Sequence, residues 1–226
     1  MTELLRVGGA TIEFEKAKKY VGDYITNSTR TWSYPAYDAY PGSPTESVEL
    51  PDLLAVSLLN AGQKPIVSYY ALESLLPKIN ERLMAVGTSG TLAQAGEETL
   101  EAIADLFGVL DDIPVKHVGM TKLAKVLHRK RPKLIPLFDE NIRRCYSVLG
   151  NKPVPPVKKR SRRDFCRAWL PALQSDLRSQ HDNWRELANV AVDPNISPLR
   201  ALDMVGWKLG GKPRTLQEQD VLSRGV

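Results

Sequence analysis

Short segments in which apolar residues recur three and four positions apart follow one another along most of this 226-residue chain. That spacing is typical of amphipathic helices, and we find no convincing segment with the strict alternation of a half-buried strand. The pattern predicts an all-α protein, an irregular bundle of about nine to ten helices. The predicted helices are residues 11–25, with Thr11 as N-cap, and residues 52–60, 68–76, 77–86, 97–107, 120–130, 140–149, 162–179, 183–190 and 197–209.

Residues 27–51 lack a helical pattern and separate the first two predicted helices. This segment is rich in Pro, Gly and Ser, yet it also holds Trp32, Tyr34, Tyr37 and Tyr40. Disordered linkers are usually poor in aromatic residues. We therefore expect an ordered aromatic loop within a single helical domain that covers residues 1–226.

The charge of the chain is unevenly distributed. Residues 116–167 hold sixteen Lys or Arg against three acidic residues, a balance of +13, whereas the whole chain carries +5. The remainder of the chain is therefore acidic. Such segregation favours a surface that binds a polyanion, and the alternative is a solvated run of charge with no ligand.

The opening sixteen residues carry charges and no apolar leader, and no apolar run approaches the ~18 residues of a membrane span. We therefore expect a cytoplasmic protein without membrane contact. In that compartment Cys145 and Cys166 are expected to be packing residues rather than a disulfide. The three histidines do not form a cluster at ligand spacing, so we expect no metal and no cofactor.

The most informative pattern lies in residues 113–150. A short turn, His117-Val118-Gly119, opens the predicted helix 120–130, which Pro132 stops. An apolar connector, residues 134–138, follows, and Asp139 heads the predicted helix 140–149. The order is helix, hairpin, helix, buried connector and acid-capped helix.

This arrangement resembles the helix-hairpin-helix superfamily of DNA glycosylases, in which hairpin glycines precede a helix and a catalytic aspartate follows an apolar connector. Asp139 lies twenty residues after Gly119, in agreement with the family's interval. The resemblance covers residues 113–150, and it is closer still to a group of actinobacterial proteins with the same Arg-Pro-Lys-Leu-Ile-Pro type of connector. It implies that Asp139 is the catalytic residue of an enzyme that excises bases from double-stranded DNA.

The chain departs from the family pattern at three points. Lys116 and His117 occupy the positions of the proline and first glycine of the hairpin, so that only Gly119 remains. Thr121 occupies the position at which bifunctional members carry the Schiff-base lysine, and Lys122 is one place further on, about 100° around the helix. A four-cysteine iron–sulfur cluster is also missing. We therefore predict a monofunctional glycosylase.

Asp139 suits the chemistry of N-glycosidic bond cleavage. Positive charge develops on the sugar, and a fixed carboxylate stabilises it or prepares a water to attack. The helix N-terminus favours the ionised carboxylate. The alternative is that Asp139 is only an N-cap, and the two roles are compatible.

A hairpin that leads into a helix N-terminus presents backbone N–H groups to a phosphate. The alternative is that Gly119 forms an ordinary turn and His117 is a plain surface residue. The predicted DNA-binding residues are His117, Gly119, Thr121, Lys122, Lys125, Arg129 and Arg143.

A base must leave the stack to be cut, and its pocket needs aromatic faces. Trp32, Tyr34 and Tyr37 are the predicted base-pocket residues, and the alternative is that these rings pin the loop onto the bundle. The remaining tryptophans, Trp169, Trp184 and Trp207, lie on helical faces and are expected in the core.

These observations lead to one hypothesis and two rivals. The hypothesis is a monomeric, nucleoid-associated DNA glycosylase that excises a damaged or modified base, in repair or in defence against phage DNA. The first rival is a non-catalytic helix-hairpin-helix DNA-binding protein, and the second is a basic subunit for an acidic protein partner. An enzyme should show a cleft with Asp139 on its wall, whereas a binding module should not.

Overall fold

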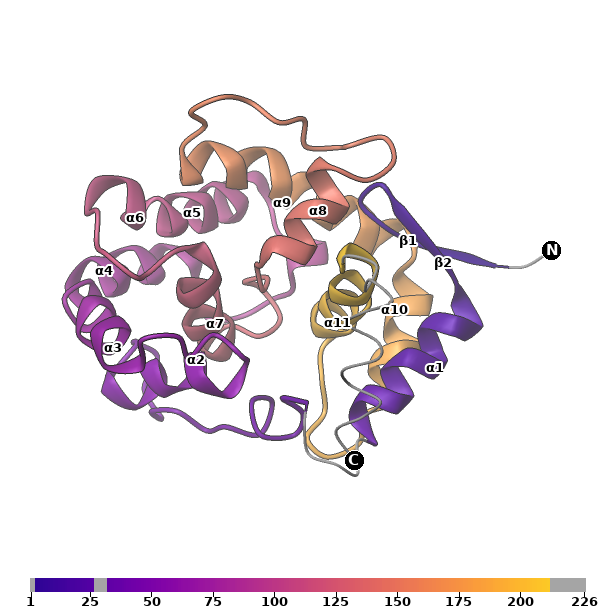
Figure 1. Cartoon of the computed structure of the whole chain (residues 1–226), viewed down its shortest axis with the longest axis horizontal. Helices are drawn as coiled ribbons and strands as arrows, with labels where there is room; N and C mark the ends of the chain where they lie inside the picture. Colours follow the sequence, from indigo (N-terminus) through magenta and orange to yellow (C-terminus); the bar gives the residue numbers. More distant parts are fainter. Residues whose placement is uncertain (1–2, 27–31, 212–226) are drawn as a thin grey trace, which may run out of the picture.

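Helices make up most of the chain, as predicted, in a computed structural model that describes residues 3–26 and 32–211 (Figure 1). The elements are β1 (Leu4–Val7), β2 (Ala10–Glu13), α1 (Phe14–Ile25), α2 (Ala55–Leu58), α3 (Pro65–Glu73), α4 (Leu76–Val86), α5 (Glu97–Phe107), α6 (Val109–Asp112), α7 (Met120–Lys130), α8 (Glu140–Ser147), α9 (Arg162–Ser179), α10 (His181–Ala188) and α11 (Pro198–Gly210). Short 3₁₀ helices cover Leu50–Leu54 and Leu92–Gln94.

Three helices, α5, α7 and α9, have the predicted bounds. Each is delimited by a strong local signal. Gly108 follows α5, Gly119 precedes α7, and the Ser161 hydroxyl accepts a hydrogen bond from the Asp164 amide at the start of α9. The other predicted helices are shifted by a few residues, and α6 was not predicted.

The N-terminal strands contradict the predicted absence of strands and the predicted helix start at Thr11. Leu4–Val7 and Ala10–Glu13 form an antiparallel hairpin in which Thr11 pairs with Arg6, so Thr11 does not cap a helix. Gly8, at φ 60°, supplies the left-handed backbone of the two-residue turn. The turn lies against α8, where the Gly9 amide donates to the Cys145 carbonyl at 2.9 Å.

The two ends of the described chain lie side by side. The hairpin and α1 pack against α10 and α11, whereas residues 50–130 form the opposite side of the molecule (Figure 1). Buried side chains from both sides, from Leu5 to Val205, form the main core, and Tyr37, Ala55 and Leu137 form a second, smaller cluster. The apolar connector after α7 therefore runs between the two sides before α8 begins.

A close approach between helices fixes the beginning of α8 against the end of α11. A Cβ atom at Gly210 would lie 1.9 Å from the Asn141 carbonyl oxygen, so a side chain there would separate the helices. The Asn141 side chain in turn donates to the Trp207 carbonyl at 3.0 Å. These contacts hold Asp139, the N-cap of α8, opposite the α11 residues that precede Gly210.

The cysteine prediction is confirmed, because Cys145 and Cys166 are both free and buried. Within residues 3–26 and 32–211, no helix combines the length and the apolar composition needed to span a membrane.

Candidate active site

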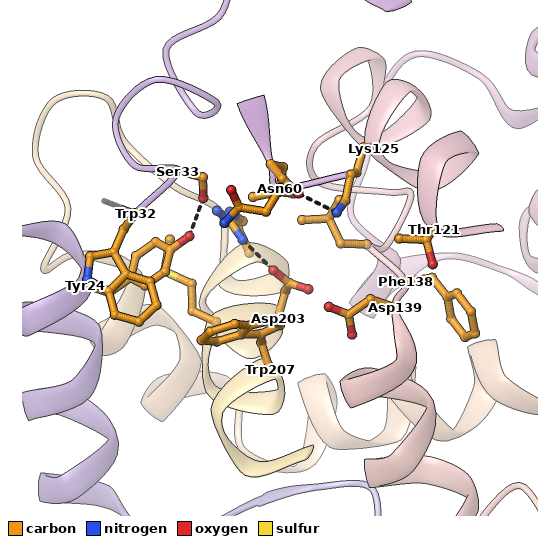
Figure 2. Close-up of a pocket in the computed structure, with 14 residues that line it drawn as sticks. Tyr24, Trp32, Ser33, Asn60, Thr121, Lys125, Phe138, Asp139, Asp203 and Trp207 are labelled. Atoms are coloured by element: carbon orange, nitrogen blue, oxygen red, sulfur yellow. Dashed lines mark hydrogen bonds and ion pairs between the residues drawn. The ribbon is translucent and has the colours of Figure 1, made fainter. Parts of the chain in front are cut away.

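A cavity of about 170 Å³ opens where α1, α7, the start of α8 and α11 meet (Figure 2). Such a volume suits one ring system, since pockets for drug-sized ligands occupy roughly 300–1,000 Å³. Aromatic rings form one part of its wall and charged or polar side chains form the other. The aromatic residues are Tyr24, Trp32, Phe138 and Trp207, and the polar ones include Ser33, Asn60, Thr121, Lys125, Asp139, Arg200 and Asp203.

Asp139 lies on the wall of this cavity and also caps α8. Its Oδ1 accepts a hydrogen bond from the Ile142 amide at 2.9 Å, which confirms the predicted N-cap. Burial raises the pKa of Asp139, and the backbone amides of Ile142 and Asn141 together with the Lys125 charge oppose that rise. One carboxylate thus serves as a cap and faces a cavity.

The connector positions Asp139 because it is buried and tied down. Leu134, Ile135 and Leu137 are each at most 4% exposed. The ring Nδ1 of His128, on α7, lies 2.7 Å from the Ile135 carbonyl, and burial lowers the pKa of His128 to about 4. The His128 imidazole is therefore neutral at physiological pH, and its contact with Ile135 joins α7 to the connector.

Lys125 contributes an amine to the cavity. Its side chain is buried, and its Nζ donates to the Leu59 carbonyl at 2.5 Å. Burial lowers the pKa of Lys125, while the charges of Asp139 and Asp203 oppose this. Lys125 is therefore not the predicted DNA-phosphate contact on the surface, because its side chain lies inside, one helical turn after Thr121.

Asp203, on α11, is a cavity residue that the sequence analysis missed. It forms an ion pair with Arg200, whose Nε also binds Asp38 at 2.8 Å. All three side chains are at most 13% exposed. The signal in the sequence is a pair of opposite charges, three residues apart, in the first half of a mostly apolar helix.

The aromatic wall is built from segments far apart in the sequence. The Trp32 and Trp207 rings meet edge to face at 5.6 Å, and Tyr24 lies 5.1 Å from Trp32. Trp207 was predicted as a core residue and instead lines the cavity, whereas Trp169 and Trp184 are fully buried, as predicted.

Of the predicted base-pocket residues, Trp32 lies at the cavity and the other two are in the core. Tyr34 donates its hydroxyl to the Pro194 carbonyl, and the fully buried Tyr37 donates to the Lys125 carbonyl at 2.7 Å. These tyrosines pin the aromatic loop onto the bundle, because a buried phenol needs an acceptor. Residues 27–31 of the predicted loop 27–51 lie outside the described residues.

The predicted hairpin residues lie on the surface at the start of α7. His117 is exposed and has a left-handed backbone, with φ 68°, while Val118 is buried beneath it. Gly119 precedes α7 with an extended backbone, and a Cβ atom at this position would meet open space. The N-terminus of α7 therefore follows an exposed glycine with open space beside it, and the first amides of a helix have no acceptor within that helix.

Three predicted phosphate contacts already have partners within the protein. The Lys122 amine donates to the Gln63 carbonyl at 2.7 Å and to the Ser68 hydroxyl. Arg129 donates to the Tyr40 carbonyl, and Arg143 pairs with Glu140. Thr121, by contrast, lines the cavity.

The tertiary structure neutralises much of the basic stretch at residues 116–167. On α9, Arg162 pairs with Asp111, Arg163 with Asp105 and Arg167 with Glu101, all acidic residues of α5 and α6. Lys130 forms a buried pair with Asp52. Seven basic side chains of this stretch have no hydrogen bond or ion pair among the described residues. They are Lys116, Lys133, Arg144, Lys152, Lys158, Lys159 and Arg160.

Groups of three or more His, Cys, Asp or Glu side chains placed to hold a metal ion do not occur in the described part of the chain.

The protein family DUF6308, a family of unknown function, matches residues 17–210. The chain belongs to the DUF6308 family. The match runs from within α1 to the end of α11 and contains every residue that lines the cavity of this DUF6308 protein. Neither a search of curated proteins nor a search of solved structures returned a match.

Proposed function

We propose that this protein is a monofunctional DNA glycosylase that hydrolyses the N-glycosidic bond of a damaged or modified base. The observation that carries the proposal is the position of Asp139, at the end of a buried connector and on the wall of a cavity lined by Trp32 and Trp207. A flipped base requires stacking faces and polar edge contacts, and a departing base requires a carboxylate near the sugar. The cavity contains all of these groups.

The turn before α7 supports a helix-hairpin-helix motif. Helices α5 and α6 precede it and α7 follows it. His117, at the place of the family's first glycine, has the positive φ that a glycine adopts easily, and Val118 supplies the buried apolar residue between the two glycine positions. The first amides at the N-terminus of α7 would bind a DNA phosphate.

The rival function is a non-catalytic helix-hairpin-helix DNA-binding protein. Such a module needs the exposed turn and Lys116, but it needs no cavity behind them. The polar side chains that line the cavity with Asp139, including the buried Lys125 and the largely buried Asp203, favour the enzyme. Monomeric action on nucleoid DNA, in repair or in phage defence, is part of the same proposal.

Single-turnover excision tests the proposal. Duplexes that carry one uracil, oxidised, alkylated or phage-type hypermodified base are incubated with excess protein, and abasic sites are then cleaved with alkali. We expect release of at least one of these bases. Duplex binding without release of any base would support the binding module instead.

Affinity for duplex DNA is expected to fall steeply with salt, because each phosphate that a Lys or Arg neutralises displaces condensed counterions. The Lys116→Ala variant should bind more weakly on every sequence and reduce the slope of log K against log salt by about 1. Fluorescence anisotropy at several salt concentrations measures both, with the exposed Lys16→Ala variant of α1 as control. A slope near zero in the wild type would exclude a nucleic-acid ligand.

Borohydride should trap no covalent enzyme–DNA adduct. Thr121 occupies the Schiff-base position, and the Lys122 amine is held by Gln63 and Ser68. Denaturing electrophoresis after borohydride treatment of the reaction measures trapping. An adduct that disappears in Lys125→Met but persists in Lys122→Met would show that the cavity amine attacks the sugar and that the enzyme is bifunctional.

A further inference from the structure

The cavity holds a second carboxylate besides Asp139, and we propose that Asp203 is the general acid that protonates the departing base. The inference rests on the proposed glycosylase function and adds the group that activates the leaving base. Asp139 acts on the sugar in this scheme, so the two carboxylates have separate tasks, as in enzymes that cleave O-glycosidic bonds.

The two carboxylates come from different helices and face one cavity. Asp139 caps α8, Asp203 lies within α11, and Figure 2 shows the two side chains pointing toward one another. Trp207 follows Asp203 by four residues and therefore lies on the same helical face. A base that stacks on Trp207 or Trp32 would bring its edge to Asp203 and its sugar to Asp139.

The hydrogen bonds of Asp203 leave one oxygen for the base. Its Oδ2 accepts from Nη1 of Arg200, and no bond to Oδ1 occurs among the described residues. Arg200 also binds both oxygens of Asp38, at 2.8 and 3.1 Å. The Arg200 guanidinium thus divides its hydrogen bonds between two carboxylates. It therefore stabilises the ionised form of Asp203 less than a guanidinium paired with Asp203 alone would.

The surroundings of Asp203 favour its neutral form more than an exposed aspartate would. Burial raises the pKa of Asp203 to about 6; Arg200 of α11 opposes this rise, Asp139 at α8 adds to it, and Lys125 of α7 opposes it. Tyr20 and Tyr24 of α1 and Tyr37 of the aromatic loop are the titratable neighbours. Two carboxylates in such different environments can divide acid and base tasks.

The proposed step balances in atoms and charge. The proton on Asp203 moves to a nitrogen or carbonyl oxygen of the base as the bond between C1′ and the base nitrogen breaks, and the electron pair of that bond leaves with the base. Asp139 stabilises the positive sugar. Water then adds to C1′, its proton passes to Asp139 and on to solvent, and solvent returns a proton to Asp203.

This assignment defines a substrate class. A neutral base is a poor leaving group unless it receives a proton. A guanine alkylated on N7, a ring nitrogen without a hydrogen, already carries positive charge and leaves without one. Asp203 therefore adapts the cavity to neutral damaged or modified bases.

The test compares Asp203→Asn with the wild type on two duplexes, one with N7-methylguanine and one with the neutral base that the wild type releases fastest. General acid catalysis contributes about 10²–10⁴-fold, so single-turnover release of the neutral base should fall by at least about 100-fold. Release of N7-methylguanine should not change, which also controls for folding. Asp23→Asn, at an exposed pair on α1, is the matched control.

The pH profile supplies a second measurement. Wild-type release of the neutral base should decline above pH about 6, where Asp203 ionises, and the decline should be missing in Asp203→Asn. Equal loss on both duplexes, no loss on the neutral base, or a wild type that releases only N7-methylguanine would each overturn the assignment while leaving the glycosylase standing. A wild type that releases no base from any duplex would overturn the glycosylase and the general acid together.

Discussion

Replacing Asp139 by Asn is expected to slow base release by about 10²–10³-fold while duplex binding stays within a few-fold of the wild type. The amide keeps the shape of the side chain and can still cap α8 through its oxygen, which takes the Ile142 hydrogen bond. It lacks the negative charge that the sugar requires in the transition state. Losing one fixed electrostatic contact of this kind costs about 10²–10³ in rate.

The measurement is single-turnover release on the best substrate, with affinity for undamaged duplex measured on the same preparations. Glu140→Gln changes the neighbouring acid at the exposed start of α8 and should keep full activity. Because burial raises the pKa of Asp139, wild-type release should also decline as the pH falls through that raised value. Equal release by Asp139→Asn and wild type would reduce Asp139 to a helix cap.

Replacing Arg200 by Met is expected to destabilise the fold strongly. Arg200 is 2% exposed, and its guanidinium binds Asp38 and Asp203 and lies over the rings of Tyr24 and Tyr37. Without it, the carboxylates of Asp38 and Asp203 lose their shared ion-pair partner in a largely buried place. Breaking a buried pair from one side costs about 3–5 kcal/mol, which corresponds to a melting temperature lower by about 10 °C in a chain of this size.

Arg143→Met is the matched control, because Arg143 also pairs with an acid three residues away, but at the surface. Exposed pairs contribute roughly 0–1 kcal/mol, so its melting temperature should shift by only a few degrees. Adding Asp38→Asn and Asp203→Asn to Arg200→Met should recover part of the loss, since no unpaired charge would then be buried. A melting temperature equal to that of Arg143→Met would contradict this role of Arg200.

Local signals were sufficient for the helices whose ends they mark. Pro132 stops a helix and Ser161 starts one through their own backbone or side-chain chemistry, so the bounds of α7 and α9 follow from the sequence. Gly108 marks the end of α5, although its backbone there is right-handed and α6 begins at the next residue. The N-terminal hairpin was not predicted. Residues 11–13 continue the helical spacing of α1, which hid the local hairpin signal of Gly8-Gly9 between two short apolar runs. Contacts of Gly8 and Gly9 with α9 and α8 add to that signal and hold the strand in place.

The prediction of a basic surface from the charge pattern agrees least with the structure. Residues 116–167 are basic in the sequence, but folding brings the acids of α5 and α6 against the arginines of α9. Ion pairing between distant segments cannot be read from a linear count of charge. The chain's own residues therefore neutralise much of the surface predicted to bind DNA.

For the site itself, the sequence determined that Asp139 caps a helix after an apolar connector, because capping and burial patterns are local. It could not determine that Tyr34 and Tyr37 are buried, that Trp207 faces a cavity, or that Asp203 lies opposite Asp139. These placements depend on how α1, α7, α8 and α11 pack together. Such packing joins residues more than sixty positions apart, and only the tertiary structure specifies it.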